Sequence, residues 1–271
     1  MCGELSVPAV PVIAVGEHDT ASAVVGIPAE TDDFAYLICG TWSLIGTELD
    51  APLMTNRRSI GILQMRAVPA AHSVLKHYGI VAVPALSGGL GKDGISYSSA
   101  ELVKLAGQSE AFRSAVDPDD PVFLNPVHMP EAIREYCRAA GQHVPETPGQ
   151  IIRCVLESLA FKYRFTFERI ETLTGKNMTD FTWRAEGFEM NCSANTRRMY
   201  CPEMYGLDRQ RQAPSATLPY RPSRSTCLGY SERPESDQGF LSSKTYVPED
   251  TEAWERAYRR YTSQILGAAS R

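Results

Sequence analysis

The sequence predicts an α/β fold, because two short apolar runs each meet a glycine at their end and a helix separates them. Residues 10–16 and residues 34–39 are the two apolar runs, and residues 18–20 open a run of small residues at 21–25. Short apolar runs with glycine stops are typical of buried strands. The order strand, polar turn, helix, strand, polar turn places both turns at one end of a sheet.

Further helices are predicted from capping signals after this first unit. Residues 98–106 suit a short helix, and residues 117–121 are a cluster of turn residues. Pro130 suits the first position of a helix, and Gly141 suits its end.

The longest predicted helix follows a capping box at residues 147–150 and stops at Gly175. A last helix is capped by residues 250–251. Both have apolar stripes at helical spacing, which predict packing on a core. The first stripe is Ile152, Val155, Leu156, Leu159, Tyr163, Ile170 and Leu173, and the second is Trp254, Tyr258, Tyr261 and Ile265.

Two long segments show neither a helical nor a strand period. They are residues 57–94 and residues 183–243, and we predict that they are irregular or poorly folded. The second is rich in arginine and proline, and no lysine occurs from Asn177 to Ser243.

Composition narrows the function classes. The 271 residues are 43% hydrophobic and 22% charged, as in globular proteins, and the net charge is −5. Nucleic acid is not an expected partner, because phosphate binding needs a basic face. Without a long apolar run or a basic leader, we expect no membrane association and a cytoplasmic location. The seven cysteines form no CxxC pair, so no metal site is expected.

Two turn residues could carry chemistry. Asp19 follows a predicted strand, and a carboxylate there can accept a proton from a substrate hydroxyl. Thr41 lies in a turn beside Gly40, where backbone amides and a hydroxyl can hold phosphate oxygens. Open α/β sheets bind ligands at such strand ends. The pattern also permits plainer roles, in which Asp19 or Thr20 caps the helix, His18 is a hydrogen-bonded neighbour, and Gly40-Thr41 is a simple turn.

Residues 12–24, VIAVGEHDTASAV, and residues 35–44, AYLICGTWSL, resemble the FGGY carbohydrate kinases and, within that family, the rhamnulokinases. Further stretches that resemble the same kinases, in the same order, are residues 117–126, 129–137, 146–160 and 246–254. The resemblance implies that residues 1–271 are a C-terminal domain of the family. It implies an incomplete α/β lobe of the actin/hexokinase-type, ribonuclease H-like ATPase fold.

The resemblance also implies an activity and roles for four residues. The activity is phosphorylation of L-rhamnulose by ATP with Mg²⁺. Asp19 matches the catalytic base, His18, Asp19 and Thr20 match sugar-binding positions, and Thr41 matches a contact to the phosphates of ATP.

Cys137 and Cys154 match a pair of cysteines that is disulfide-linked in some relatives. In a reducing cytosol we expect free thiols at least as often. The residues alone leave both states open.

Three parts of the family pattern are missing. They are the N-terminal lobe, an Asn-x-Thr-Asn-Glu-Gly-Gly stretch expected after Asn56, and a Gly-Gly-Gly-x-x-Asn stretch expected after Asp180. Codons for residues 61–68 and 183–201, read one nucleotide earlier, permit both missing motifs, and codons for residues 76–82, read one nucleotide later, permit a further family stretch. We therefore expect a gene fragment with two frame-shifted segments and a separately encoded N-terminal lobe, and no activity from this chain alone.

Two other functions are compatible with the sequence. One is a kinase for another ketose, such as fuculose or xylulose, because much of the sugar site lies in the missing parts. The other is a non-catalytic remnant or an interaction protein built on the same lobe.

Overall fold

The computed structural model describes ten stretches of the chain: residues 34–39, 42–49, 64–68, 71–79, 97–178, 180–185, 188–193, 216–217, 242–245 and 251–267. The predicted strand at 10–16 and the predicted helix at 21–25 lie outside these residues.

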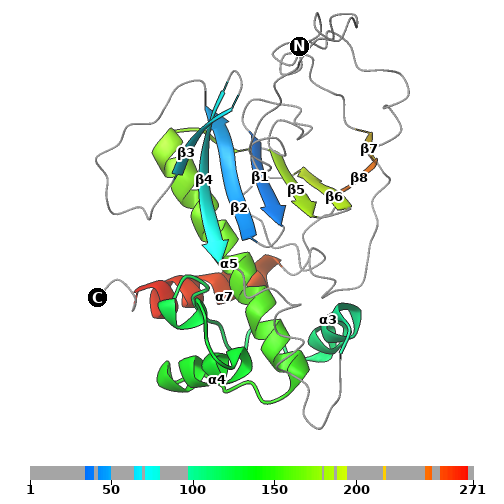
Figure 1. Ribbon diagram of the computed structural model, residues 1–271, viewed down its shortest axis with the longest axis vertical. Helices are drawn as coiled ribbons and strands as arrows, with labels where there is room; N and C mark the ends of the chain where they lie inside the picture. The colour runs from blue at the N-terminus through cyan, green and yellow to red at the C-terminus, as the bar shows by residue number, and fades with distance from the viewer. Residues whose placement is uncertain are drawn as a thin grey trace, which may run out of the picture.

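A mixed eight-stranded sheet forms one layer of the molecule (Figure 1). Its spatial order is β3-β4-β2-β1-β5-β6-β8-β7, with β1 parallel to β5, β6 parallel to β8, and the other neighbours antiparallel. The strands are β1 (Phe34–Cys39), β2 (Trp42–Leu49), β3 (Gln64–Val68), β4 (Ala71–Gly79), β5 (Asp180–Ala185), β6 (Phe188–Ser193), β7 (Ala216–Thr217) and β8 (Ser242–Thr245).

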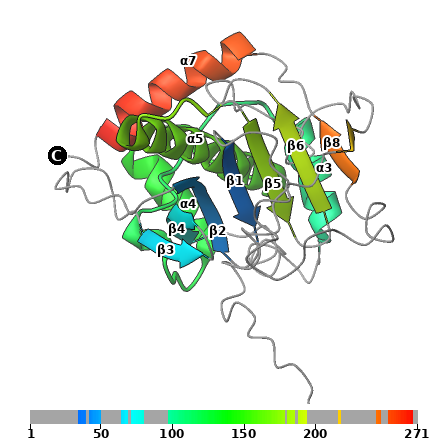
Figure 2. The ribbon, with the colours of Figure 1, turned by 90° about the horizontal axis from the view of Figure 1, so that it is seen from above.

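Helices lie on one side of the sheet and beyond one of its ends. They are α3 (Ser99–Gln108), the 3₁₀ turn η1 (Pro121–Phe123), α4 (Met129–Ala139), α5 (Pro148–Thr174), α7 (Thr251–Tyr261) and the π-helical turn η6 (Thr262–Leu266). Seen from above, α5 lies between the sheet and α7 (Figure 2). The arrangement is therefore a sheet, a central helix and an outer helix.

Both ends of α5 and the start of α3 lie where the sequence predicts them, whereas α4 begins at Met129, one residue before the predicted Pro130. Thr147 and Gln150 form a reciprocal capping box at the start of α5, and Gly175 ends the helix with a left-handed φ of 68°. Ser98 and Glu101 form a second capping box at the start of α3. Local signals fix these boundaries because each satisfies backbone groups that the helix leaves without partners.

The predicted stripe of α5 forms the main core. All its residues are buried except Leu173, which is half-buried, and they pack with α3, α4, β1 and β2. Gly149 permits a close approach of α3 and α5, because a Cβ atom there would lie 2.5 Å from the carbonyl oxygen of Leu105. A side chain at Gly149 would push the two helices apart.

The two segments that we expected to be irregular contain strands. β3 and β4 lie within residues 57–94, and β6, β7 and parts of β5 and β8 lie within residues 183–243. Strand pairing satisfies backbone groups without requiring an alternating side-chain pattern, so periodicity does not report it. The division of the chain into ordered and irregular parts otherwise stays a prediction.

Candidate functional site

The candidate site is one edge of the sheet, where β1 and β5 end side by side. Cys39 is the last residue of β1, and it pairs with Ala185, the last residue of β5. Because the two strands are parallel, the residues that follow them leave the sheet at the same edge. Figure 1 shows the arrowheads of β1, β4 and β5 at the end of the sheet nearer α3 and α4.

Three strands end at this edge, β1, β4 and β5, and two strands, β2 and β6, begin there. Trp42, the first residue of β2, pairs with Gly79, the last residue of β4, and Phe188, the first of β6, pairs with Ala185. The edge thus gathers the ends of five strands from three distant parts of the sequence. Such strand ends are where open α/β sheets bind ligands.

The four predicted site residues, His18, Asp19, Thr20 and Thr41, lie outside the described residues. The confirmed strand β1 ends two residues before Thr41, so the chain approaches that position at the carboxyl end of a strand, as predicted. The catalytic and binding roles of the four residues stay predictions.

Buried contacts fix the strand that leads to this edge. Phe34, Ala35, Tyr36 and Leu37 of β1 are buried, and the Thr47 hydroxyl of β2 donates to the Phe34 carbonyl oxygen over 2.7 Å. This bond locks the pairing of β1 with β2 at the end far from the candidate site.

Within the described residues, no group of three or more His, Cys, Asp or Glu side chains could hold a metal ion. In the same part of the chain, no helix is both long and apolar enough to cross a membrane. Neither finding assigns a function.

Cys137 and Cys154 are free, buried thiols that lie against each other. A hydrogen bond to Cys137 and complete burial raise the pKa of Cys154, and the hydrogen bond from Cys154 lowers the pKa of Cys137. Inside the α4–α5 core, the Cys154 thiol therefore donates a hydrogen bond and the Cys137 sulfur accepts it.

Sequence reasoning missed a polar face on α5. Arg153, Glu157, Ser158 and Lys162 recur at helical spacing, and they bind the connection between α3 and α4. The Lys162 ammonium lies 2.6 Å from Asp117, and Lys162 as a whole is 5% exposed. Charged residues inside an apolar pattern suggest such a face only when a partner segment is known.

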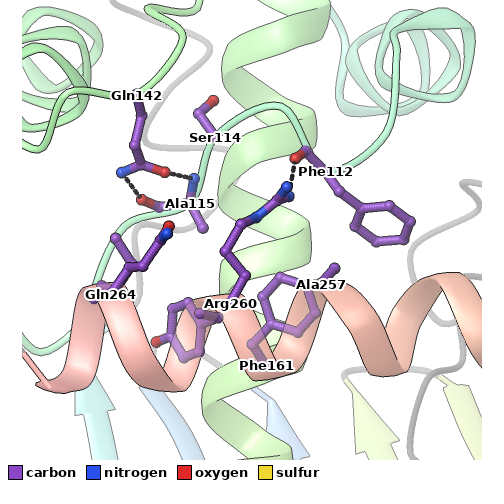
Figure 3. Close-up of a pocket in the computed structure, with 10 residues that line it drawn as sticks. Phe112, Ser114, Ala115, Gln142, Phe161, Ala257, Arg260 and Gln264 are labelled. Carbon is purple, nitrogen blue, oxygen red and sulfur yellow. Dashed lines mark hydrogen bonds between the residues drawn. The ribbon is translucent and has the colours of Figure 1, made fainter.

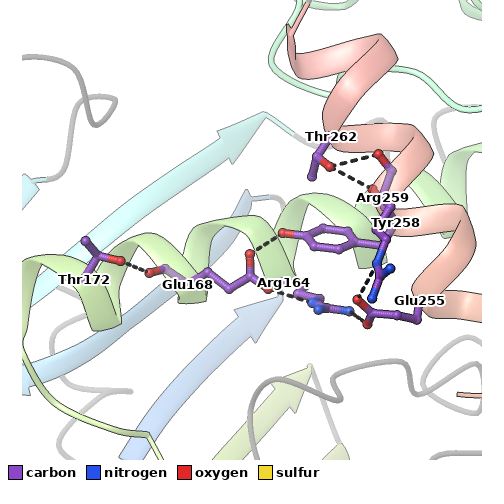
Figure 4. Close-up of polar contacts among 7 residues, drawn as sticks. All are labelled: Arg164, Glu168, Thr172, Glu255, Tyr258, Arg259 and Thr262. Atoms are coloured by element: carbon purple, nitrogen blue, oxygen red, sulfur yellow. Dashed lines mark hydrogen bonds and ion pairs between the residues drawn. The ribbon is translucent and has the colours of Figure 1, made fainter. Parts of the chain in front are cut away.

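A second polar group on α5 holds α7 (Figure 4). Arg164 donates to Glu168 and to Glu255, both over 2.8 Å, and its guanidinium lies 4.0 Å from the centre of the Tyr258 ring. The Tyr258 hydroxyl donates to Glu168 over 2.6 Å. Burial, followed by the bond to Glu168, raises the pKa of Tyr258, so this hydroxyl stays a donor.

Residues 35–181 match the model of the FGGY family of carbohydrate kinases, C-terminal domain. The chain belongs to the FGGY family of carbohydrate kinases. The match begins inside β1 and ends inside β5, so it joins the two strands that form the candidate edge. The match runs through residues 57–94 and stops two residues before Trp183, so the two frame-shifted segments stay a prediction.

The relatives of this FGGY chain include several rhamnulokinases. That of Bacteroides thetaiotaomicron is 45% identical over 168 residues, covering 61% of this chain and 34% of the relative. That of Pectobacterium atrosepticum is 40% identical over 57% of this chain and 31% of the relative, and that of Bacillus subtilis is 33% identical over 66% and 36%. The chain thus spans about a third of the length of these curated relatives.

Solved structures confirm the fold class of this FGGY chain. The xylulose kinase of Rhodospirillum rubrum aligns with a TM-score of 0.52 at 15% identity, covering 92% of this chain and 49% of that one. A xyloylose kinase from Brucella ovis aligns with a TM-score of 0.56 at 15% identity, covering 99% and 55%. At this identity the likeness shows the fold alone, and the predicted α/β, actin/hexokinase-type lobe is confirmed.

Proposed function

We propose that the complete protein to which this chain belongs phosphorylates L-rhamnulose with ATP. The observation that carries the proposal is the 45% identity to a rhamnulokinase across 61% of the chain. The match to the FGGY family model, residues 35–181, includes most of β1, the strand that leads to the candidate edge. The cytoplasm, where ATP is abundant, is the proposed location.

The proposed chemistry assigns one task to each predicted residue. The Asp19 carboxylate accepts the proton of the attacking sugar hydroxyl, and His18 and Thr20 position the sugar. Thr41, two residues after the end of β1, binds phosphate oxygens of ATP. Catalysis of phosphoryl transfer then consists mainly of positioning and charge stabilisation.

Mg²⁺ is proposed only as the ion that accompanies the phosphates of ATP. The described residues offer no protein cluster of metal ligands, so the chain itself is not proposed to hold a resident metal. Magnesium commonly binds through substrate phosphates and few protein ligands, which agrees with this assignment.

The part of the relatives' length that this chain does not cover suggests a partner. Because the chain spans 34% of the Bacteroides relative, we propose that an N-terminal kinase lobe, encoded separately or in the same interrupted gene, completes the cleft. Resequencing the coding DNA with its upstream region tests this. We expect an upstream frame for that lobe and off-frame motifs at residues 61–68 and 183–201, and clean bases without those motifs would refute it.

The substrate is tested on the frame-restored protein together with its N-terminal lobe. ADP release is measured with L-rhamnulose, L-fuculose and xylulose at equal concentrations. We expect the largest kcat/KM with L-rhamnulose. A larger value with another ketose would replace the proposed substrate, and no turnover with any sugar would favour a non-catalytic remnant.

The chain as it stands is the matched negative control. We expect no ADP release from it, because the proposed N-terminal lobe that would complete the cleft is not in the assay. Turnover by the unrepaired chain would overturn the need for a completing lobe.

A further inference from the structure

Phe112 has the most unusual backbone in the connection between α3 and α4. Its φ is 58°, and it is the one non-glycine residue with positive φ in the part of the chain that the structure describes. Bulky side chains rarely adopt this left-handed conformation, because the Cβ atom crowds the backbone. Surrounding contacts must therefore hold the residue in place.

The amide of Phe112 is held by α5. Its N–H donates to the Glu157 carboxylate over 2.8 Å, and Glu157 is 1% exposed. Arg153 orients that carboxylate over 2.6 Å and donates to the carbonyl oxygens of Ala106 and Ser109 at the end of α3. One ion pair on α5 thus fixes the end of α3 and the amide of Phe112.

The carbonyl and the ring of Phe112 are held by α7. The Arg260 guanidinium donates to the Phe112 carbonyl oxygen (Figure 3). The Phe112 ring meets Trp254 edge-on, with 4.8 Å between ring centres, and lies 6.2 Å from the Phe161 ring of α5. A single strained residue therefore bonds one helix through its N–H and another through its carbonyl group and ring.

A small cavity lies beside this residue, between the connection, α5 and α7 (Figure 3). Its volume of about 10 Å³ leaves room for about one water molecule. The far wall is Gln142, whose side-chain amide bonds both the N–H and the carbonyl oxygen of Ala115, over 2.9 and 2.8 Å. The tight fit leaves the connection little freedom to move while α7 is docked.

The π-helical turn η6 continues α7 along the same cavity, which Gln264 and Ile265 help to line. The N–H of Gly267 donates to the carbonyl oxygen of Thr262, as a π-helix requires. Two costly backbone features, the left-handed Phe112 and the π turn, thus face one cavity. Such features persist where surrounding contacts over-determine them.

We propose that Phe112 is a strained clasp that couples the docking of α7 to the packing of residues 109–119 on α5, so that the two segments open together. Removing a contact on either side releases the strain and the contacts on the other side. The proposal concerns this fold and is independent of the sugar specificity.

Amide hydrogen exchange of the full chain tests the clasp. Arg260→Ala removes the tie from α7, and we expect the fold to be retained because Arg260 is exposed. We expect exchange at Phe112, Ala115 and Val116 to quicken about tenfold, the size typical for loss of a charged hydrogen bond. Arg256→Ala is the matched control, because Arg256 lies on the same helix and pairs with Glu252 instead.

A change on the α5 side of Phe112, with exchange measured in α7, distinguishes coupling of the two segments from loosening of the mutated segment alone. Glu157→Gln weakens the tie to α5, but its lost charge also acts on Arg260 of α7, so Ser158→Ala, which removes the acceptor of the Val116 amide and no described bond to α7, is measured beside it. We expect the amides of α7 to exchange faster in Glu157→Gln and in Ser158→Ala, and Arg260→Lys, which keeps a donor, to restore slow exchange. Changes confined to the mutated element in both variants would overturn the clasp.

Discussion

The two faces of α5 are buried by different chemistry. One face carries the apolar residues that pack with α3, α4 and the first two strands, among them Ile152 and Phe167. The other carries Arg153, Glu157 and Lys162, which bond the 109–119 connection. The apolar face supplies burial free energy, whereas the polar face selects one path for a connection that has no apolar period of its own.

The largest expected effect is on the apolar face. Phe167 is 1% exposed, and Phe167→Ala should lower the free energy of unfolding by about 3–5 kcal/mol, since it removes buried area and leaves a cavity. Urea unfolding measures this. Thr172→Ala, on the exposed side of the same helix, is the control and should change stability by less than about 0.5 kcal/mol. Equal effects of the two changes would show that this face is not the core.

A somewhat smaller effect is expected on the polar face. Lys162→Met leaves Asp117 buried without its cation and should cost about 3 kcal/mol. The double variant with Asp117→Asn should recover most of that loss, because the asparagine oxygen still accepts from the Asp119 amide. If the losses of unfolding free energy in the two single variants simply add in the double variant, the pair of Lys162 and Asp117 does not hold the 109–119 connection.

The pH dependence of stability gives a finer test of the polar face. Burial raises the pKa of Glu157 from its ordinary 4.5, against the opposing effects of Arg153, the Phe112 amide and Arg260. The folded chain therefore holds this proton more tightly than the unfolded chain, so the contribution of Glu157 to stability is full below the ordinary pKa. It is lost as the pH rises through the raised pKa.

Urea unfolding of wild type and Glu157→Gln at pH 4.5 and pH 7.5 measures that contribution. The free energy of unfolding of wild type, relative to that of the variant, should be greater at pH about 4.5 than at pH about 7.5. A difference between the two proteins that is the same at both pH values would contradict the raised pKa.

Much of the fold follows from local sequence signals. The capping box at Thr147, the glycine stop at Gly175 and the apolar run of β1 are short-range patterns, and each was found where predicted. The polar face of α5 could not be predicted, because Glu157 and Lys162 acquire their partners 45 residues away. Strands β3 and β4 escaped prediction because their pairing is a backbone property.

The candidate site was also predictable only in part. The position of its supporting strand was predictable from residues 34–39, since an apolar run before a glycine is a local signal. The roles of Asp19 and Thr41 rest on resemblance to the FGGY kinases, because a carboxylate or hydroxyl at a turn has several possible uses.

The most direct test of the kinase assignment is the effect of Asp19→Asn on the frame-restored protein with its N-terminal lobe. Steady-state ADP release with L-rhamnulose should show kcat lowered by about 10²–10⁴, with KM changed only a few-fold, because a general base acts in the transition state. Glu146→Gln, an exposed carboxylate far along the chain, is the control and should leave both constants unchanged. An Asp19→Asn enzyme with the wild-type kcat would contradict the assignment of Asp19 as the base.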